Sequence, residues 1–146
     1  MDYKSKIILI AGPTASGKSK IAINLAKKIN GEIVNADSMQ VYKQLKILTA
    51  RPSEKDQKTI KHHLFGIIDV RKRFSTGQWL KECIKIINLI RKKKKTPIIV
   101  GGTGLYFKAL VDGLVRIPKF KLSEKNKILK LHNKLGQKQF YKKLVK

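Results

Sequence analysis

The sequence predicts an α/β fold in which helices flank a parallel β-sheet. Three continuous apolar runs, at residues 6–11, 32–36 and 97–100, are typical of strands that are buried on both faces. Amphipathic helical patterns lie between these runs, and a strand, helix, strand unit makes its two strands parallel. Because parallel strands end on the same side of a sheet, we expect the turns that follow them to meet at one edge.

A complete phosphate-loop motif, G-x-x-x-x-G-K-[ST], follows the first run directly. Its glycines let the backbone curl so that successive N–H groups point at phosphate oxygens, and the start of the next helix adds its dipole. The lysine supplies a cation, and the serine supplies a hydroxyl that suits a phosphate-bound Mg²⁺. The motif predicts a P-loop NTPase-like fold with a diphosphate or triphosphate bound by Gly12, Pro13, Thr14, Ala15, Ser16, Gly17, Lys18 and Ser19.

A helix is expected immediately after this loop, where Ile21, Leu25, Ala26 and Ile29 recur at helical spacing and Asn30 offers a left-handed stop. The order strand, loop, helix is the one that the motif requires. It disfavours the alternative, a glycine-rich turn that binds nothing.

Asp37 comes directly after the second apolar run, so we expect it to face the phosphate loop across the crevice at the sheet edge. A carboxylate beside phosphates is unfavourable unless it holds a metal ion or handles a proton. The alternative is that Asp37 caps the turn after it.

The segment between residues 49 and 74 carries weaker signals. Residues 49–53 indicate a turn, in which Arg51 either reaches a phosphate or is simply solvated. His62 and His63 are adjacent, so their side chains point apart and joint metal ligation is not expected. Asp69 ends an apolar run and is either a metal carboxylate of a phosphate-loop enzyme or the start of a turn.

A long amphipathic helix is predicted to begin at the capping-box spacing of Ser75 and Gln78 and to end in the basic run 91–95. Its apolar face is expected to hold Trp79, Leu80, Cys83, Ile84, Ile87 and Ile90. Because Cys83 lies on this apolar face, we expect its side chain to be buried in the packing rather than to be a reactive thiol.

The third strand follows this helix, and we expect the glycine-rich turn at residues 101–106 to lie at the same sheet edge.

A lysine-rich helical pattern begins near residue 118 and has no companion strand. We divide the chain into an incomplete P-loop α/β core, residues 1–116, and the beginning of a helical insertion, residues 117–146.

Composition sets broader bounds. The formal net charge is +25, which favours a nucleic acid or another anionic surface, although an AT-rich genome alone would produce the same excess of lysine. One cysteine excludes an intramolecular disulfide and suits a reducing compartment. The apolar run before Gly12 is too short for a signal peptide or a membrane span, so we expect a cytoplasmic protein without a membrane partner.

Five sequence blocks in the same order make the chain resemble the N-terminal part of the tRNA dimethylallyltransferase (tRNA isopentenyltransferase) family. The blocks are residues 12–19, 35–42 (N-A-D-S-M-Q-V-Y), 49–52 (T-A-R-P), 62–64 (H-H-L) and 101–106 (G-G-T-G-L-Y). The resemblance implies transfer of a dimethylallyl group from dimethylallyl diphosphate to N6 of the adenosine 3′-adjacent to the tRNA anticodon. Members of the family are about twice as long as this chain, and the resemblance implies that residues 117–146 are the beginning of a helical tRNA-binding insertion.

The resemblance also implies roles for individual residues. The loop from Gly12 to Ser19 holds the diphosphate of the prenyl donor, with Mg²⁺ bound through Ser19, although such loops are commonly labelled as ATP sites. The catalytic residues are Asp37, as the general base, and Thr103. The implied tRNA-binding residues are Asp37, Ser38, Met39, Gln40, Thr103 and Arg51.

Two other interpretations of the sequence remain open. One is a P-loop kinase of a small molecule, for which the sequence lacks an arginine cluster after the second strand. Another is a truncated, non-catalytic fragment that binds tRNA. We expect the partners to be the tRNA anticodon stem-loop and dimethylallyl diphosphate, and the chain to be a monomer.

Overall fold

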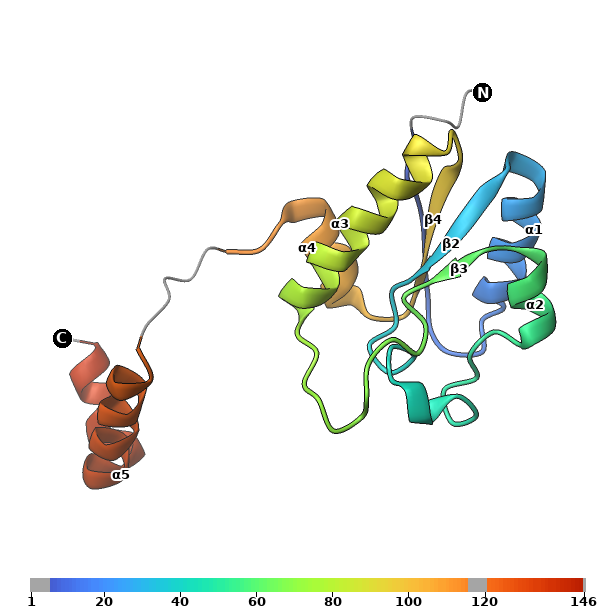
Figure 1. Cartoon of the computed structure of the whole chain (residues 1–146). Helices are drawn as coiled ribbons and strands as arrows, with labels where there is room; N and C mark the ends of the chain where they lie inside the picture. Colours follow the sequence, from blue (N-terminus) through green and yellow to red (C-terminus); the bar gives the residue numbers. More distant parts are fainter. Residues whose placement is uncertain (1–5, 116–120, 146) are drawn as a thin grey trace. The chain divides into compact units, whose positions relative to one another are not determined.

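A computed structural model describes residues 6–115 and 121–145 (Figure 1). The chain forms two compact units, Met1–Leu114 and Val115–Lys146. The predicted domain boundary at residue 116 lies outside the described residues.

The first unit is built on a parallel sheet of strands β1 (Ile8–Ala11), β2 (Gly31–Asn35), β3 (His62–His63) and β4 (Thr96–Gly101). The order in the sheet is β1-β4-β2-β3, so β4 lies between the first two strands of the sequence. This arrangement confirms the predicted parallel α/β fold. The apolar-run analysis anticipated three strands and missed β3, which has two residues and depends on its pairing with β2.

Helices cover both faces of this sheet (Figure 1). Helices α3 (Thr76–Lys92) and α4 (Gly104–Asp112) pack on one face, where Val34 and Ile99 meet Trp79 and Tyr106. Helix α1 (Lys18–Ile29) packs on the other face through Ala22. Two short elements, the 3-10 helix η1 (Lys43–Leu45) and helix α2 (Glu54–Thr59), follow β2 and precede β3 in the sequence.

The faces of two helices differ from the sequence prediction. Helix α3 buries Trp79 and Cys83 as expected. Ile84 is 46% exposed, because it lies on a different side of the helix from these two residues. Ile21 of α1 is 57% exposed, since small alanines at the neighbouring position and one turn later bring the helix close to the sheet. Burial raises the pKa of the Cys83 thiol to about 12, as suits a packing residue.

The carboxyl ends of β2 and β4 approach each other unusually closely. A Cβ atom on Gly101 would lie 2.1 Å from the carbonyl carbon of Ala36, so this position requires glycine. The Thr103 amide donates to the Ala36 carbonyl oxygen, 3.1 Å away. The turns after these two strands are therefore tied together at the sheet edge.

The second unit contains α5 (Leu122–Leu144), whose helical backbone is interrupted at Gly136, with φ of +70°. Its apolar residues Ile128 and Leu129 are about half exposed. Among residues 6–115 and 121–145, no helix has the length and apolar character needed to cross a membrane.

Candidate active site

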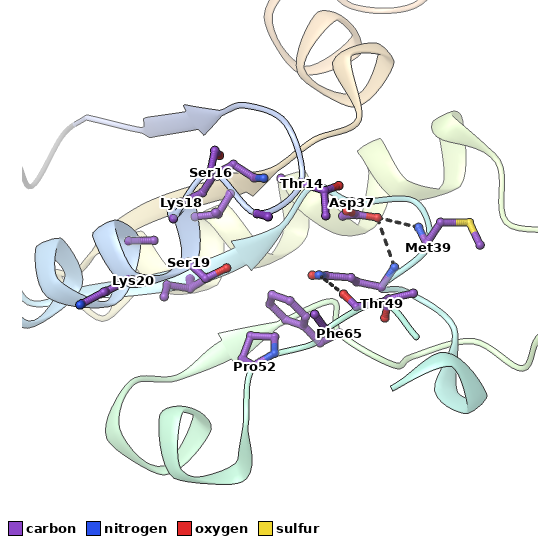
Figure 2. A pocket seen from close by; sticks show the side chains of 18 of the residues that line it. Thr14, Ser16, Lys18, Ser19, Lys20, Asp37, Met39, Thr49, Pro52 and Phe65 are labelled. Carbon is purple, nitrogen blue, oxygen red and sulfur yellow. Dashed lines mark hydrogen bonds between the residues drawn. The ribbon is translucent and has the colours of Figure 1, made fainter. Parts of the chain in front are cut away.

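A pocket of about 650 Å³ opens at the carboxyl edge of the sheet (Figure 2). The phosphate loop borders it on one side and Asp37 on another, while the segments around Thr49 and Phe65 border it below in this view. The sequence prediction that Asp37 faces the phosphate loop is thus confirmed by the topology. It follows from two parallel strands that end at one edge.

The phosphate loop has the tight curvature that its glycines predict. Gly17 has φ of +80° and is the N-terminal cap of α1, and Ala15 also has positive φ. The Ser16 hydroxyl donates to the Pro13 carbonyl, 2.8 Å away, and the Lys18 ammonium donates to the same oxygen. Lys18 and Ser19 both line the pocket, where a cation and a hydroxyl can meet an anionic ligand.

Asp37 is held by its own turn. Its Oδ1 accepts hydrogen bonds from the amides of Met39, at 2.8 Å, and Gln40, at 3.4 Å (Figure 2). Capping of this turn, the alternative considered from the sequence, is therefore present together with exposure to the pocket. Oδ2 of Asp37 has no hydrogen bond within the part of the chain that the structure describes.

The glycine-rich turn after β4 makes hydrogen bonds to the turn that carries Asp37. Thr103 Oγ1 accepts a hydrogen bond from the Ser38 amide, 2.9 Å away, and donates to the Ser38 hydroxyl, 3.2 Å away. Thr103 thereby fixes the residue next to Asp37.

The pocket is also lined by apolar side chains, which the sequence patterns did not predict. They are Leu48, Pro52 and Phe65, and the His62 ring packs edge-on against Phe65 with ring centroids 5.5 Å apart. Burial lowers the pKa of His62, despite the hydrogen bond between its Nδ1 and the Ile60 carbonyl. No local pattern marks these residues, because the loop from 48 to 52 and strand β3 meet only in the folded chain.

Of the predicted site residues, the pocket is lined by Thr14, Ala15, Ser16, Gly17, Lys18, Ser19, Asp37, Met39 and Gln40. The other predicted site residues, Gly12, Pro13, Ser38, Arg51 and Thr103, are not among the described lining residues. Arg51 extends over Gly66 and donates to the Lys43 carbonyl, 2.9 Å away. Its predicted contact with tRNA therefore stays a prediction.

His63 and Asp69 both make contacts that do not involve a metal ion. His62 lines the pocket, whereas His63 does not. The Nε2 atom of His63 lies 2.7 Å from a carboxylate oxygen of buried Glu32, so the two histidine side chains point apart, as predicted. Asp69 accepts from the Arg71 amide and guanidinium, which lowers the pKa of its carboxyl, and so starts a turn. Within residues 6–115 and 121–145, no group of three or more His, Cys, Asp or Glu side chains could hold a metal ion.

Comparison with known proteins agrees with this geometry. The family model for IPP transferase matches residues 40–146. The chain belongs to the IPP transferase family. The tRNA dimethylallyltransferase of Pelagibacter ubique is 64% identical over the whole chain, which covers 47% of that protein. The tRNA dimethylallyltransferase of Rhizobium rhizogenes is 47% identical over 94% of the chain and 46% of its own length.

Solved structures of IPP transferases share the fold. The tRNA isopentenylpyrophosphate transferase of Bacillus halodurans is 33% identical, with a TM-score of 0.74, over 88% of this chain and 43% of its own. A eukaryotic dimethylallyltransferase acting on tRNA is 34% identical, with a TM-score of 0.77, over 88% of this chain and 34% of its own. The chain thus spans about half the length, or less, of the relatives that it matches.

Proposed function

We propose that this chain carries the reaction centre of a tRNA dimethylallyltransferase. The reaction moves a dimethylallyl group from dimethylallyl diphosphate to N6 of the adenosine 3′-adjacent to the anticodon and releases pyrophosphate. One observation carries the proposal: the phosphate loop and the Asp37 carboxylate line the same pocket. Relatives named tRNA dimethylallyltransferase support it.

The phosphate loop suits the diphosphate end of the donor. Lys18 and the start of α1 supply positive charge where the pyrophosphate leaves, which favours the transition state. The Ser19 hydroxyl lines the same space and, with diphosphate oxygens, makes the set of oxygen ligands that Mg²⁺ prefers. When bound, Mg²⁺ would neutralise charge on the departing pyrophosphate.

Asp37 suits the acceptor end. With Oδ1 held by two backbone amides, Oδ2 is available to take a proton from the exocyclic amine of adenine. The N6 nitrogen then attacks the allylic carbon of the donor, a C–N bond forms, the C–O bond to the diphosphate breaks, and pyrophosphate carries away the electron pair. Met39 and Gln40, beside Asp37 in the pocket, together with Ser38, Thr103 and Arg51, are the proposed contacts to the tRNA.

The composition of the pocket favours prenyl transfer over phosphoryl transfer. A donor with a diphosphate and a five-carbon apolar group matches a pocket lined both by the phosphate loop and by the apolar side chains of Leu48, Pro52 and Phe65. Phosphoryl transfer calls for several cations around the transferred group. The described lining contains Lys18 and Lys20 but no arginine.

Asp37→Asn tests the proposal with little change in shape. We expect transfer of labelled dimethylallyl groups into tRNA to fall at least about 100-fold, the usual effect of removing a general base. Binding of inorganic pyrophosphate in the presence of Mg²⁺, measured by calorimetry, should stay unchanged, because the phosphate loop is intact. Near-normal transfer by the variant would refute the role of Asp37.

A further inference from the structure

Asn35, the last residue of β2, is fully buried and lies two residues before Asp37 in the sequence. Its Oδ1 accepts a hydrogen bond from the Asp37 amide, 2.9 Å away, and its Nδ2 donates to the Asp37 carbonyl, 2.9 Å away. The same Nδ2 donates to the Leu64 carbonyl, 3.1 Å away. The side chain thus uses an acceptor and both donor positions on three backbone groups.

These bonds fix both ends of the Asp37 residue. Its amide and its carbonyl are both held by one rigid side chain, and the next amide is held by Thr103. The backbone of Asp37 therefore has little freedom to turn, and the Cα–Cβ direction of the carboxylate is set. Asn35 is itself anchored, because its carbonyl accepts from the Trp79 indole, 2.8 Å away, and Trp79 stacks on Tyr106.

The third bond reaches the other wall of the pocket. Leu64 has φ of +62°, a left-handed conformation that is rare for a residue with a branched side chain. Its carbonyl meets Asn35, and the next residue, Phe65, lines the pocket. Asn35 therefore connects the turn that carries Asp37 to the segment that carries the aromatic wall.

We propose that Asn35 is a positioning residue for the transfer reaction, which sets the distance and orientation between the Asp37 carboxylate and the Phe65 side of the pocket. This inference rests on the proposed function, in which Asp37 takes the N6 proton. Asn35 is not among the described residues that line the pocket, so it acts through its neighbours and does not touch the substrates.

Asn35→Asp isolates this role because it changes shape very little. The new carboxylate can still accept a hydrogen bond from the Asp37 amide. It cannot donate to the carbonyl oxygens of Asp37 and Leu64, because an oxygen atom now stands where the Asn35 amide nitrogen was. The turn must shift to separate the facing oxygen atoms. A displacement of the order of 1 Å at a reacting group lowers rates by roughly 100-fold, so we expect kcat to fall about 10- to 100-fold.

The experiment measures transfer from labelled dimethylallyl diphosphate to tRNA with the full chain, at varied donor concentrations. The expected result is a lower kcat with the KM for the donor within about twofold of wild type, since the phosphate loop is intact and Asp37, which Asn35 positions, acts in the transition state. Amide hydrogen exchange is measured on the same samples. The Met39 amide should lose protection because its acceptor is Asp37 Oδ1, while the β4 amides keep theirs.

Asn88→Asp is the matched control, because it makes the same chemical change on the exposed face of α3. It should leave kcat and the Met39 amide unchanged. If Asn35→Asp fails to fold, Asn35→Ser is the second variant: its hydroxyl is too short to reach both carbonyls, and the same two readings decide.

The outcomes separate the two proposals. A wild-type chain that transfers label while Asn35→Asp keeps its kcat overturns the positioning role. An unchanged Met39 amide in the variant also overturns it, whether or not any turnover occurs. A wild-type chain that transfers no label counts against the proposed function, and exchange at Met39 then still reports whether Asn35 holds the Asp37 turn.

Discussion

Glu32→Gln should destabilise the first unit, because it removes the negative charge of a buried ionic cluster. Glu32 is 2% exposed. Its carboxylate lies 2.7 Å from His63 Nε2, 3.0 Å from the Lys95 ammonium and 3.6 Å from that of Lys93. Glutamine keeps the shape of the side chain but not the charge that these three groups share.

The size of the effect follows from the exposure of the partners. Removing one member of a buried ion pair costs about 3–5 kcal/mol when the other charge stays buried. Here the side chains of Lys95 and Lys93 are 34% and 43% exposed, so they can turn to water, whereas His63 cannot. We therefore expect a loss of about 2 kcal/mol in the free energy of unfolding, or about 8 °C in Tm for a unit of this size.

The pH dependence gives this prediction a signature. Burial acts to raise the pKa of Glu32, but hydrogen bonds from His63 and Lys95 and the charges of both lysines lower it below its ordinary value of 4.5. A carboxyl whose folded pKa is depressed contributes stability above its unfolded pKa and loses it as the pH falls toward the folded value. The difference between wild type and Glu32→Gln should therefore be full at pH 7 and shrink below pH 4.5.

Urea unfolding at pH 7 and at pH 4 measures both effects without the ionic screening that guanidinium brings. Glu54→Gln is the control, since Glu54 is an exposed partner of Lys46 and its charge should contribute little to stability. Equal stabilities of wild type and Glu32→Gln at pH 7 would refute the reasoning.

Two further predictions concern packing. Gly101→Ala should lower the free energy of unfolding by more than about 3 kcal/mol, because the new Cβ atom meets the Ala36 backbone. In Gly104→Ala the new Cβ atom meets no neighbour within 4 Å, so this variant should be neutral or slightly stabilised. Similar urea midpoints for both variants would be inconsistent with the close approach at Gly101. The Cys83 thiol, buried and with a pKa of about 12, should resist an aromatic disulfide reagent at pH 8 in the native protein and react within seconds in 8 M urea; rapid labelling of the native protein would show that the α3 face opens.

The parts of the site that depend on topology could be predicted from the sequence. A phosphate loop after one strand and Asp37 after the next must share an edge if the strands are parallel, and β1 and β2 are both parallel to β4. Both turns lie at this edge whether or not another strand separates β1 from β2, so the strand order, in which β4 lies between them, does not affect the prediction.

The missed elements are those that depend on contacts distant in sequence. Strand β3 has too few residues for a periodic pattern, and Phe65, which lines the pocket, follows a left-handed residue, Leu64, that no sequence pattern marks. The role of Asn35 depends on a partner 29 residues away. Helix α2 is different, since its capping box of Ser53 and Asp56 is a local signal that could have been recognised.

The exposed positions Ile84 and Ile21 show a second limit. Apolar spacing identifies a helix and its approximate face, but the width of the buried stripe depends on how closely the helix approaches the sheet. In α1 the contact is made by Ala22, which no hydrophobicity pattern would rank above its isoleucine neighbour.

Transfer of labelled dimethylallyl groups into unmodified tRNA tests the central claim most directly. The purified chain, alone and joined to the C-terminal half of the Pelagibacter ubique relative, is incubated with labelled dimethylallyl diphosphate, Mg²⁺ and a tRNA with adenosine 3′ to the anticodon. We expect label on that adenosine and its loss in the Asp37→Asn form of the same protein. Absence of label from the joined protein, or label undiminished by Asp37→Asn, would contradict it.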